Sequence, residues 1–194
     1  MKKFLIILLA ALLTFSFISC GDEAKAPSID GFVAAVKKTN PKEVLISIKS
    51  ETALGELNGT YKTVYAEDGS FTIEYSYEKF NEIGEGAEDE LTSTVTGTVT
   101  CDKNGNYSDG GALTGTTTLV TGAKINLAKA KATVSIDGNS LTAKIKAADT
   151  KAVLGVELPS DAELVMAKSG DVIVSYTIKY QNASGEVVIS CEYK

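Results

Sequence analysis

From Glu43 to the end of the chain, apolar and polar residues alternate with a period of two in one segment after another. This alternation predicts β-strands with one face on a core and the other in water, because successive side chains in a strand point to opposite faces. Turn sequences separate the segments at Asp68-Gly69, Asn104-Gly105 and Asp137-Gly138. Consecutive strands joined by short turns pair antiparallel. The pattern therefore favours a meandering antiparallel sheet of about nine or ten strands.

The aromatic residues favour one register for the first long hairpin. If residues 67–69 form a three-residue loop, Tyr65 pairs with Phe71 and Tyr61 pairs with Tyr75. The aromatic rings of both strands then lie on the same face, and agreement of this kind normally fixes the register of a hairpin.

The later strands carry two further patterns. Thr occupies every even position from 92 to 100 in the strand 91–101, which suits a sheet face in contact with water. Another Thr-rich strand is predicted at 112–120, and three strands close the chain at 163–167, 171–180 and 185–193. In the strand 171–180, strict alternation places five apolar or aromatic residues on one face: Val172, Val174, Tyr176, Ile178 and Tyr180.

The hairpin around Asp137-Gly138 has unusually small inward residues. A two-residue loop there pairs Val134 with Leu141, and continues by pairing two alanines with residues of the strand 141–147. A core lined with alanine leaves volume unless something large packs opposite. We therefore expect an apolar ligand at this hairpin. The expected lining residues, including two from a helix at 148–155, are Ala130, Ala132, Val134, Leu141, Ala143, Ile145, Val153 and Leu154.

A helix is predicted at 28–39, where one apolar stripe contains Ile29, Phe32, Val33 and Val36. With the helix at 148–155, the predicted fold is α+β and mainly β. It is an antiparallel meandering sheet that forms an incomplete barrel, with two short helices packed against it.

The N-terminus has the pattern of an export signal. Two lysines precede an apolar run at 4–18, which is short for a membrane span of about 20 residues. The run ends in Ser19-Cys20, which resembles the bacterial lipobox, and this resemblance implies diacylation of Cys20. An ordinary secretory signal or an N-terminal membrane helix are the alternatives. We expect a signal peptide at 1–19, an acylated flexible tether at 20–27 and one β-rich domain at 28–194, held on a membrane of the cell envelope.

Composition excludes several classes of function. The chain has no His and no Arg, and its formal net charge of −6 becomes −8 without Lys2 and Lys3. The lack of His rules out Ser-His and Cys-His catalytic pairs and imidazole ligands for a metal. The negative charge argues against nucleic acid as a partner, because such binding depends on neutralising phosphates. We expect no cofactor and no metal.

Two local motifs have competing interpretations. Cys101 and Cys191 both lie on apolar strand faces, and in an exported chain they form either a disulfide or two separate buried thiols. The segment 102–109 has the spacing of a calcium loop, but Tyr107 and Leu113 stand where an EF-hand needs Gly and Glu. A hairpin turn is the favoured interpretation. The acidic run at 81–90 is expected to be a solvated loop, with a cation site as the alternative.

The order of elements resembles the LolA/LolB and LppX/LprG lipoprotein-carrier superfamily. The shared layout is a lipobox, a short tether, a helix at 28–39 and a long antiparallel meander, in which a short helix at 148–155 precedes three closing strands. The resemblance implies an incomplete barrel whose concave face holds acyl chains under a helical lid. LolA-type carriers latch the lid with a buried Arg, and this chain has no Arg, so their handover mechanism is not implied.

We therefore expect a membrane-anchored, non-enzymatic protein that binds an apolar or lipid-like ligand. The first alternative is a structural or adhesive surface domain with a filled core. The second is an enzyme that acts through a pair of carboxylates.

Overall fold

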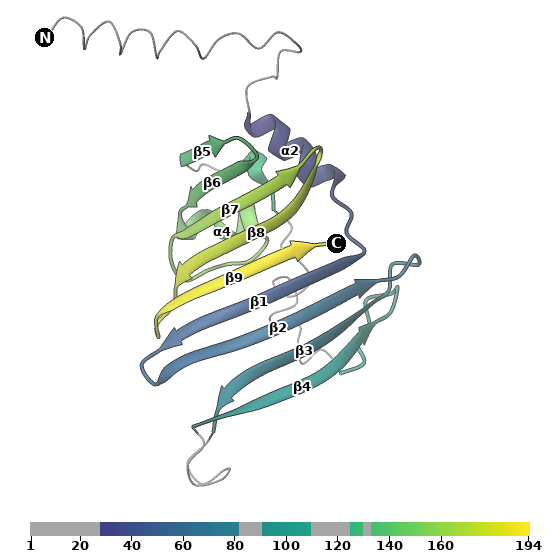
Figure 1. Ribbon diagram of the computed structural model, residues 1–194, viewed down its shortest axis with the longest axis vertical. Helices are drawn as coiled ribbons and strands as arrows, with labels where there is room; N and C mark the ends of the chain where they lie inside the picture. The colour runs from purple at the N-terminus through teal and green to yellow at the C-terminus, as the bar shows by residue number, and fades with distance from the viewer. Residues whose placement is uncertain (1–27, 82–90, 110–124, 130–132) are drawn as a thin grey trace, which may run out of the picture.

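The computed structural model describes residues 28–81, 91–109, 125–129 and 133–194 (Figure 1). The predicted signal, Cys20 and the tether lie outside the described residues, as do Ala130, Ala132, most of the acidic run and the predicted strand at 112–120.

Nine strands form one antiparallel sheet in the described part of the chain, in the order β4-β3-β2-β1-β9-β8-β7-β6-β5. The sheet does not close into a barrel, and two short helices accompany it, which confirms the predicted fold class (Figure 1). The elements are α2 (Ile29–Lys38), β1 (Glu43–Thr52), β2 (Gly55–Tyr65), β3 (Phe71–Phe80), β4 (Thr92–Cys101), η1 (Leu127–Lys129), β5 (Thr133–Asp137), β6 (Ser140–Ile145), η2 (Ala147–Asp149), α4 (Thr150–Leu154), β7 (Ala162–Ser169), β8 (Val172–Gln181) and β9 (Glu186–Tyr193).

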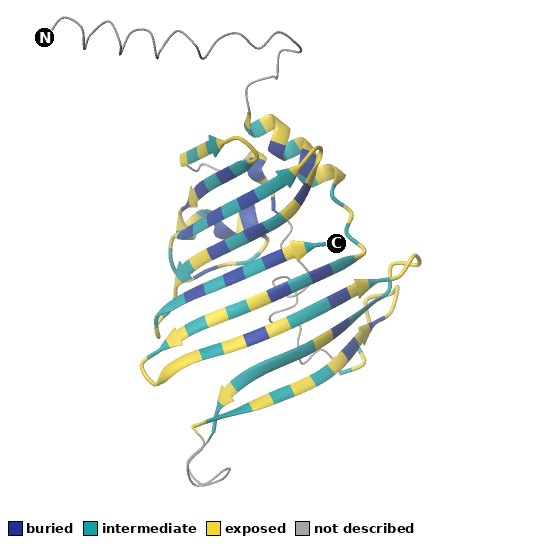
Figure 2. Cartoon of the chain, in the orientation of Figure 1, coloured by how far each residue is buried: buried dark blue, intermediate teal, exposed yellow. Residues whose placement is uncertain are grey.

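The main core lies against the half of the sheet that contains β5 to β9. There α2 packs on β8 through Phe32 and Ala35, and α4 adds Val153 and Leu154, all of them buried. The buried residues of Figure 2 accordingly gather around α2, α4 and β6 to β9. No described helix packs over β3 and β4.

The aromatic hairpin has the predicted register. Tyr65 pairs with Phe71 and Tyr61 pairs with Tyr75, with ring centroids 5.5 Å and 6.5 Å apart. The alternation of Thr in β4 is confirmed as well, because the threonines at 94, 96, 98 and 100 are exposed. Half-buried aromatic residues on one face and exposed Thr residues on the other are therefore consistent with a single register for β2, β3 and β4.

The alanine hairpin differs from the prediction by two residues. Val134 pairs with Ala143 rather than Leu141, and the loop is formed by residues 138 and 139. Gly138 has a φ of +54°, so it supplies the left-handed conformation that the first turn position needs. Because the register shifts by two residues, each side chain of the hairpin stays on the face of the sheet that was predicted for it. Before this hairpin, η1 occupies Leu127–Lys129, and β5 begins at Thr133.

The prediction for β8 is wrong at its beginning. Ile173 is buried, whereas Val172 and Val174 are exposed. The pairing with β7 changes register between Ala167 and Lys168, which is a β-bulge that leaves Val174 without a partner. One extra residue reverses the alternation, so only the part from Tyr176 onward keeps the predicted face.

A disulfide between Cys101 and Cys191 is also contradicted, because both residues are free thiols. Cys101 ends β4 and Cys191 lies in β9, with three strands between them in the sheet. At about 4.8 Å per strand this places their backbones about 19 Å apart. A disulfide needs Cα atoms within about 7 Å. The alternative of two separate buried thiols holds.

Candidate ligand-binding groove

The C-terminal end of α2 is fixed to β8 by two side chains. The Thr39 hydroxyl donates to the carbonyl oxygen of Ala35 at 2.8 Å and accepts from the backbone N–H of Ile173 at 2.8 Å. Lys38 forms an ion pair with Asp171 at 2.6 Å, in the turn before β8. These contacts hold one end of the helix over the sheet and leave its flank facing the ends of β2 and β9.

An open groove of about 1050 Å³ lies along this flank, and we call it the α2 groove. Its walls are α2, the link from α2 to β1, the end of β2 with its turn, and the segment around η1, while β7, β8 and β9 form its floor. The lining residues are Val33, Val36, Lys37, Thr39, Asn40, Pro41, Lys42, Tyr65, Ala66, Glu67, Gly69, Ile125, Asn126, Leu127, Ala128, Met166, Ile173 and Tyr193. Most of these are apolar or aromatic, and the charged ones are exposed.

The six predicted ligand-lining residues that the structure describes lie elsewhere. Leu141, Ala143 and Ile145 of β6 are at most 1 % exposed, and Val153 and Leu154 of α4 are fully buried. They belong to the packed core, with Val134 at its margin, and none of these six lines the α2 groove. Ala143 lies between two larger side chains in the sheet, because it pairs with Val134 of β5 on one side and with Leu164 of β7 on the other.

Sequence reasoning did not locate the groove, because every described residue that was predicted to line a ligand site lies outside its lining. Val33 and Val36 belong to the predicted apolar stripe of the helix. Ile173 was hidden by the bulge in β8, and Met166 and Tyr193 gave no signal beyond ordinary strand alternation. Because the groove joins segments distant in sequence, no local pattern could locate it.

The floor of the groove adjoins a buried thiol. Cys191 is 1 % exposed, and burial raises its pKa to about 12. Burial also raises the pKa of Tyr193, whose ring packs against Tyr176 at 5.8 Å between centroids. Both groups are therefore neutral at physiological pH, and a neutral thiol is a poor nucleophile.

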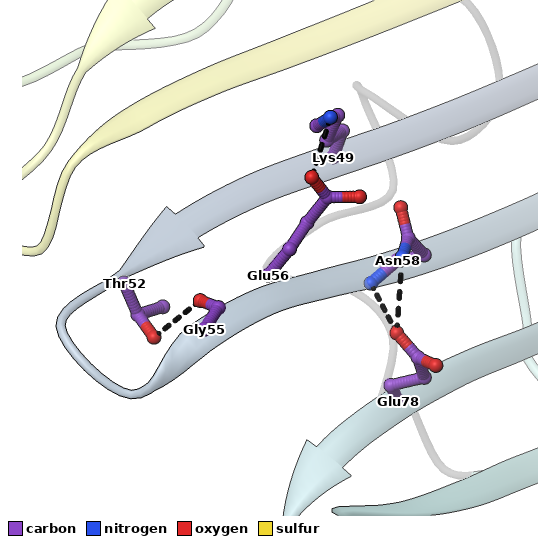
Figure 3. A network of polar contacts seen from close by, with 6 residues as sticks. All are labelled: Lys49, Thr52, Gly55, Glu56, Asn58 and Glu78. Carbon is purple, nitrogen blue, oxygen red and sulfur yellow. Dashed lines mark hydrogen bonds and ion pairs between the residues drawn. The ribbon is translucent and has the colours of Figure 1, made fainter.

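The carboxylates with resolved contacts serve the strands and turns. On the sheet between β1, β2 and β3, Glu56 pairs with Lys49 at 2.5 Å, and Glu78 accepts two hydrogen bonds from Asn58 (Figure 3). Lys49, Glu56 and Asn58 are exposed and Glu78 is half-buried, so these side chains align neighbouring strands next to water rather than form a desolvated pair of carboxylates.

The segment after β4 forms the favoured hairpin turn. The Asp102 carboxylate accepts from the backbone N–H groups of Asn104 and Asn106 and from the Asn106 side chain, at 2.8–2.9 Å. These hydrogen bonds, chiefly those from Asn106, lower its pKa. Among the described residues, no group of three or more potential ligands is arranged to hold a metal ion.

A second hollow of about 510 Å³ lies on the sheet over β1, β2, β3 and β9. Its lining mixes hydroxyl and charged side chains, including Ser47, Lys62, Glu74 and Glu192. It has about half the volume of the α2 groove, and most of its lining residues carry hydroxyl or charged groups, so it is a weaker candidate for an apolar ligand.

Among the described helices, none is both long and apolar enough to cross a bilayer. In comparisons with known proteins, no protein-family model matches the chain and no curated protein sequence is similar to it. The geometry of the α2 groove is therefore the main structural basis for proposing a function.

Proposed function

We propose that the chain is an exported lipoprotein, anchored to a membrane of the cell envelope through Cys20, whose β-rich domain holds an apolar or lipid-like ligand in the α2 groove. The observation that carries the proposal is a groove of about 1050 Å³ with a mostly apolar lining. Ligand pockets commonly have volumes of about 300–1,000 Å³ and combine apolar walls with a few polar groups.

The groove also has the polarity that an amphipathic ligand needs. Val33, Val36 and Tyr193 are half-buried and offer apolar surface, while Lys37, Lys42 and Glu67 lie among the lining residues as charged groups. Burying each methylene of an acyl chain contributes about 0.8 kcal/mol. An occupant that places its chain on the floor and its polar end in water would satisfy both parts. This is the general arrangement that the resemblance to the LolA/LolB and LppX/LprG superfamily implies.

The proposed activity is binding without catalysis. Carboxylate-pair chemistry needs two acidic groups in one cleft, and the described lining of the α2 groove includes one, Glu67. A structural or adhesive domain without a ligand remains the second candidate. It is favoured by the tight packing of Leu141, Ala143 and Ile145, where the sequence predicted the void.

Native mass spectrometry of the protein after gentle detergent extraction tests the proposal. We expect a co-purified apolar molecule, and binding of the neutral fluorescent probe N-phenyl-1-naphthylamine after delipidation. Val36→Trp should abolish both, because the larger side chain occupies the groove. Ala34→Trp is the matched control, since Ala34 is exposed on the same helix and does not line the groove.

One result would contradict the presence of a ligand, and another would contradict its location in the α2 groove. A parent protein that carries no molecule and does not bind the probe supports the structural or adhesive alternative. Equal loss of binding in Val36→Trp and Ala34→Trp would mean that the site is not in the α2 groove.

A further inference from the structure

The outer edge of β4 has backbone hydrogen-bonding groups that no other described strand pairs with. The Thr100 carbonyl accepts from the N–H of Ser108 at 2.9 Å, and the Thr100 N–H donates to the Ser108 hydroxyl, on the side away from β3. Backbone groups alternate in direction along a strand, so those of Thr92, Thr94, Thr96 and Thr98 point outward as well. Within the described part of the chain, no strand pairs with them.

This edge lacks the usual protection against strand pairing. Natural edge strands carry charges, proline or bulges, or are very short. β4 is ten residues long, has no charged residue and no proline, and pairs with β3 in one unbroken register. The opposite edge strand, β5, is only five residues long and ends in Asp137. β4 also lies at the end of the sheet farthest from α2 (Figure 1).

We propose that β4 is an interaction surface for a second copy of this chain, with the two β4 strands paired antiparallel about a two-fold axis. The segment 107–108 already occupies the edge at Thr100 and Cys101. The longest symmetric pairing that avoids it covers residues 92–98 and therefore has Val95 on the axis.

This register is consistent in hydrogen bonding and in side chains. It pairs Thr92 with Thr98 and Thr94 with Thr96 of the second copy. Each residue whose backbone N–H and C=O point outward therefore faces a residue of the second copy whose groups also point outward, and the two can exchange hydrogen bonds. Each pair is Thr with Thr, a favourable cross-strand combination without like charges. Paired antiparallel residues share a face, so the aromatic face of one sheet continues into that of the other. Leu91, which is 57 % exposed, comes next to the edge of the second copy.

Disulfide trapping in intact cells that produce the full-length chain tests the register. Val95→Cys should give a cross-linked dimer with the oxidant diamide on a non-reducing gel, because Cα atoms of facing residues at such a position lie about 4.5 Å apart. Ser93→Cys is the matched control on the same strand face. Its two copies would be about 13 Å apart and should not cross-link. The parent chain measures the background from the buried Cys101 and Cys191.

Two further variants test the backbone pairing in the Val95→Cys protein. Thr98→Pro removes an outward N–H but none of the bonds to β3, and should reduce cross-linking about tenfold. Thr96→Lys keeps every backbone group and should reduce cross-linking through like charges across the axis, which guards against misfolding as the cause. The proposal is overturned if Val95→Cys fails to cross-link, if Ser93→Cys cross-links equally well, or if both added substitutions leave the dimer unchanged.

Discussion

At the scale of single residues, burial determines the chemistry of the most perturbed groups. Cys191 has no cationic neighbour that would favour its thiolate, and desolvation raises its pKa to about 12. In the unfolded chain a thiol has a pKa of about 8.5. The folded protein therefore keeps a proton that the unfolded chain releases in alkaline solution.

This difference predicts a loss of stability at high pH. The stabilising contribution is fully present below about pH 8.5 and is lost as the pH rises toward 12, because the unfolded state then binds fewer protons. Between pH 9 and 10 the free energy of unfolding should fall by up to about 1.4 kcal/mol per pH unit. Urea unfolding at pH 8, 9 and 10 measures this slope. Cys191→Ala should flatten it, and a parent protein with constant stability over this range would contradict the assignment.

At the scale of the elements, β8 shows what one extra residue does to a strand. The run of Val172, Ile173 and Val174 is apolar at every position, so alternation alone cannot identify the inward residue. The bulge selects Ile173, whose backbone N–H also binds Thr39 and so anchors α2. The bulge therefore places both a core residue and a contact of the helix.

The bulge predicts opposite effects for neighbouring substitutions. Ile173→Asp should destabilise the fold by several kcal/mol, because it buries an unpaired charge beside the α2 groove. Val174→Asp should cost about 1 kcal/mol or less, since that side chain is exposed. Thermal melts of both variants measure the difference. A larger effect at Val174 would mean that β8 runs in strict alternation without the bulge.

The elements show clearly what the sequence could predict. The aromatic hairpin was predictable in detail because Tyr65, Phe71, Tyr61 and Tyr75 agree on one face. The pairing of β1 with β9 and the position of the α2 groove were not, since each depends on contacts between distant segments. The shift of the alanine hairpin shows the limit of turn rules. Gly138 fits a two-residue loop at 137–138 as well as one at 138–139. The structure has the second loop, in which β6 also pairs with β7.

At the scale of the whole molecule, the described domain and the expected anchor are separate parts. The predicted tether at 20–27 is small and polar, so it offers no surface of its own for a bilayer. Attachment should therefore depend on the lipid on Cys20. The domain itself would remain in the aqueous phase beside the membrane, with the α2 groove close to the tether in sequence.

Substitution of Cys20 tests this division. A processed Cys20→Ser protein should leave the membrane fraction and appear in the soluble fraction of the envelope. Centrifugation followed by immunoblotting measures the distribution, with the parent protein as the control. Retention of a processed Cys20→Ser chain on the membrane would show that another part of the protein binds the bilayer.

The central position of β1 and β9 has a consequence for how the chain reaches its native state. The meander β1–β4 and the meander β5–β9 are each built from neighbours along the chain, and only the pairing of β1 with β9 joins them. This seam brings together residues such as Val44 and Tyr193, which are 149 positions apart. Closing so long a loop costs entropy before the pairing returns any stability, and contacts of this range slow folding. Neighbouring strands within each half can thus begin to pair while the chain is still emerging from a ribosome or translocation channel, whereas the packing of α2 on β8 and the completion of the sheet wait for the later strands.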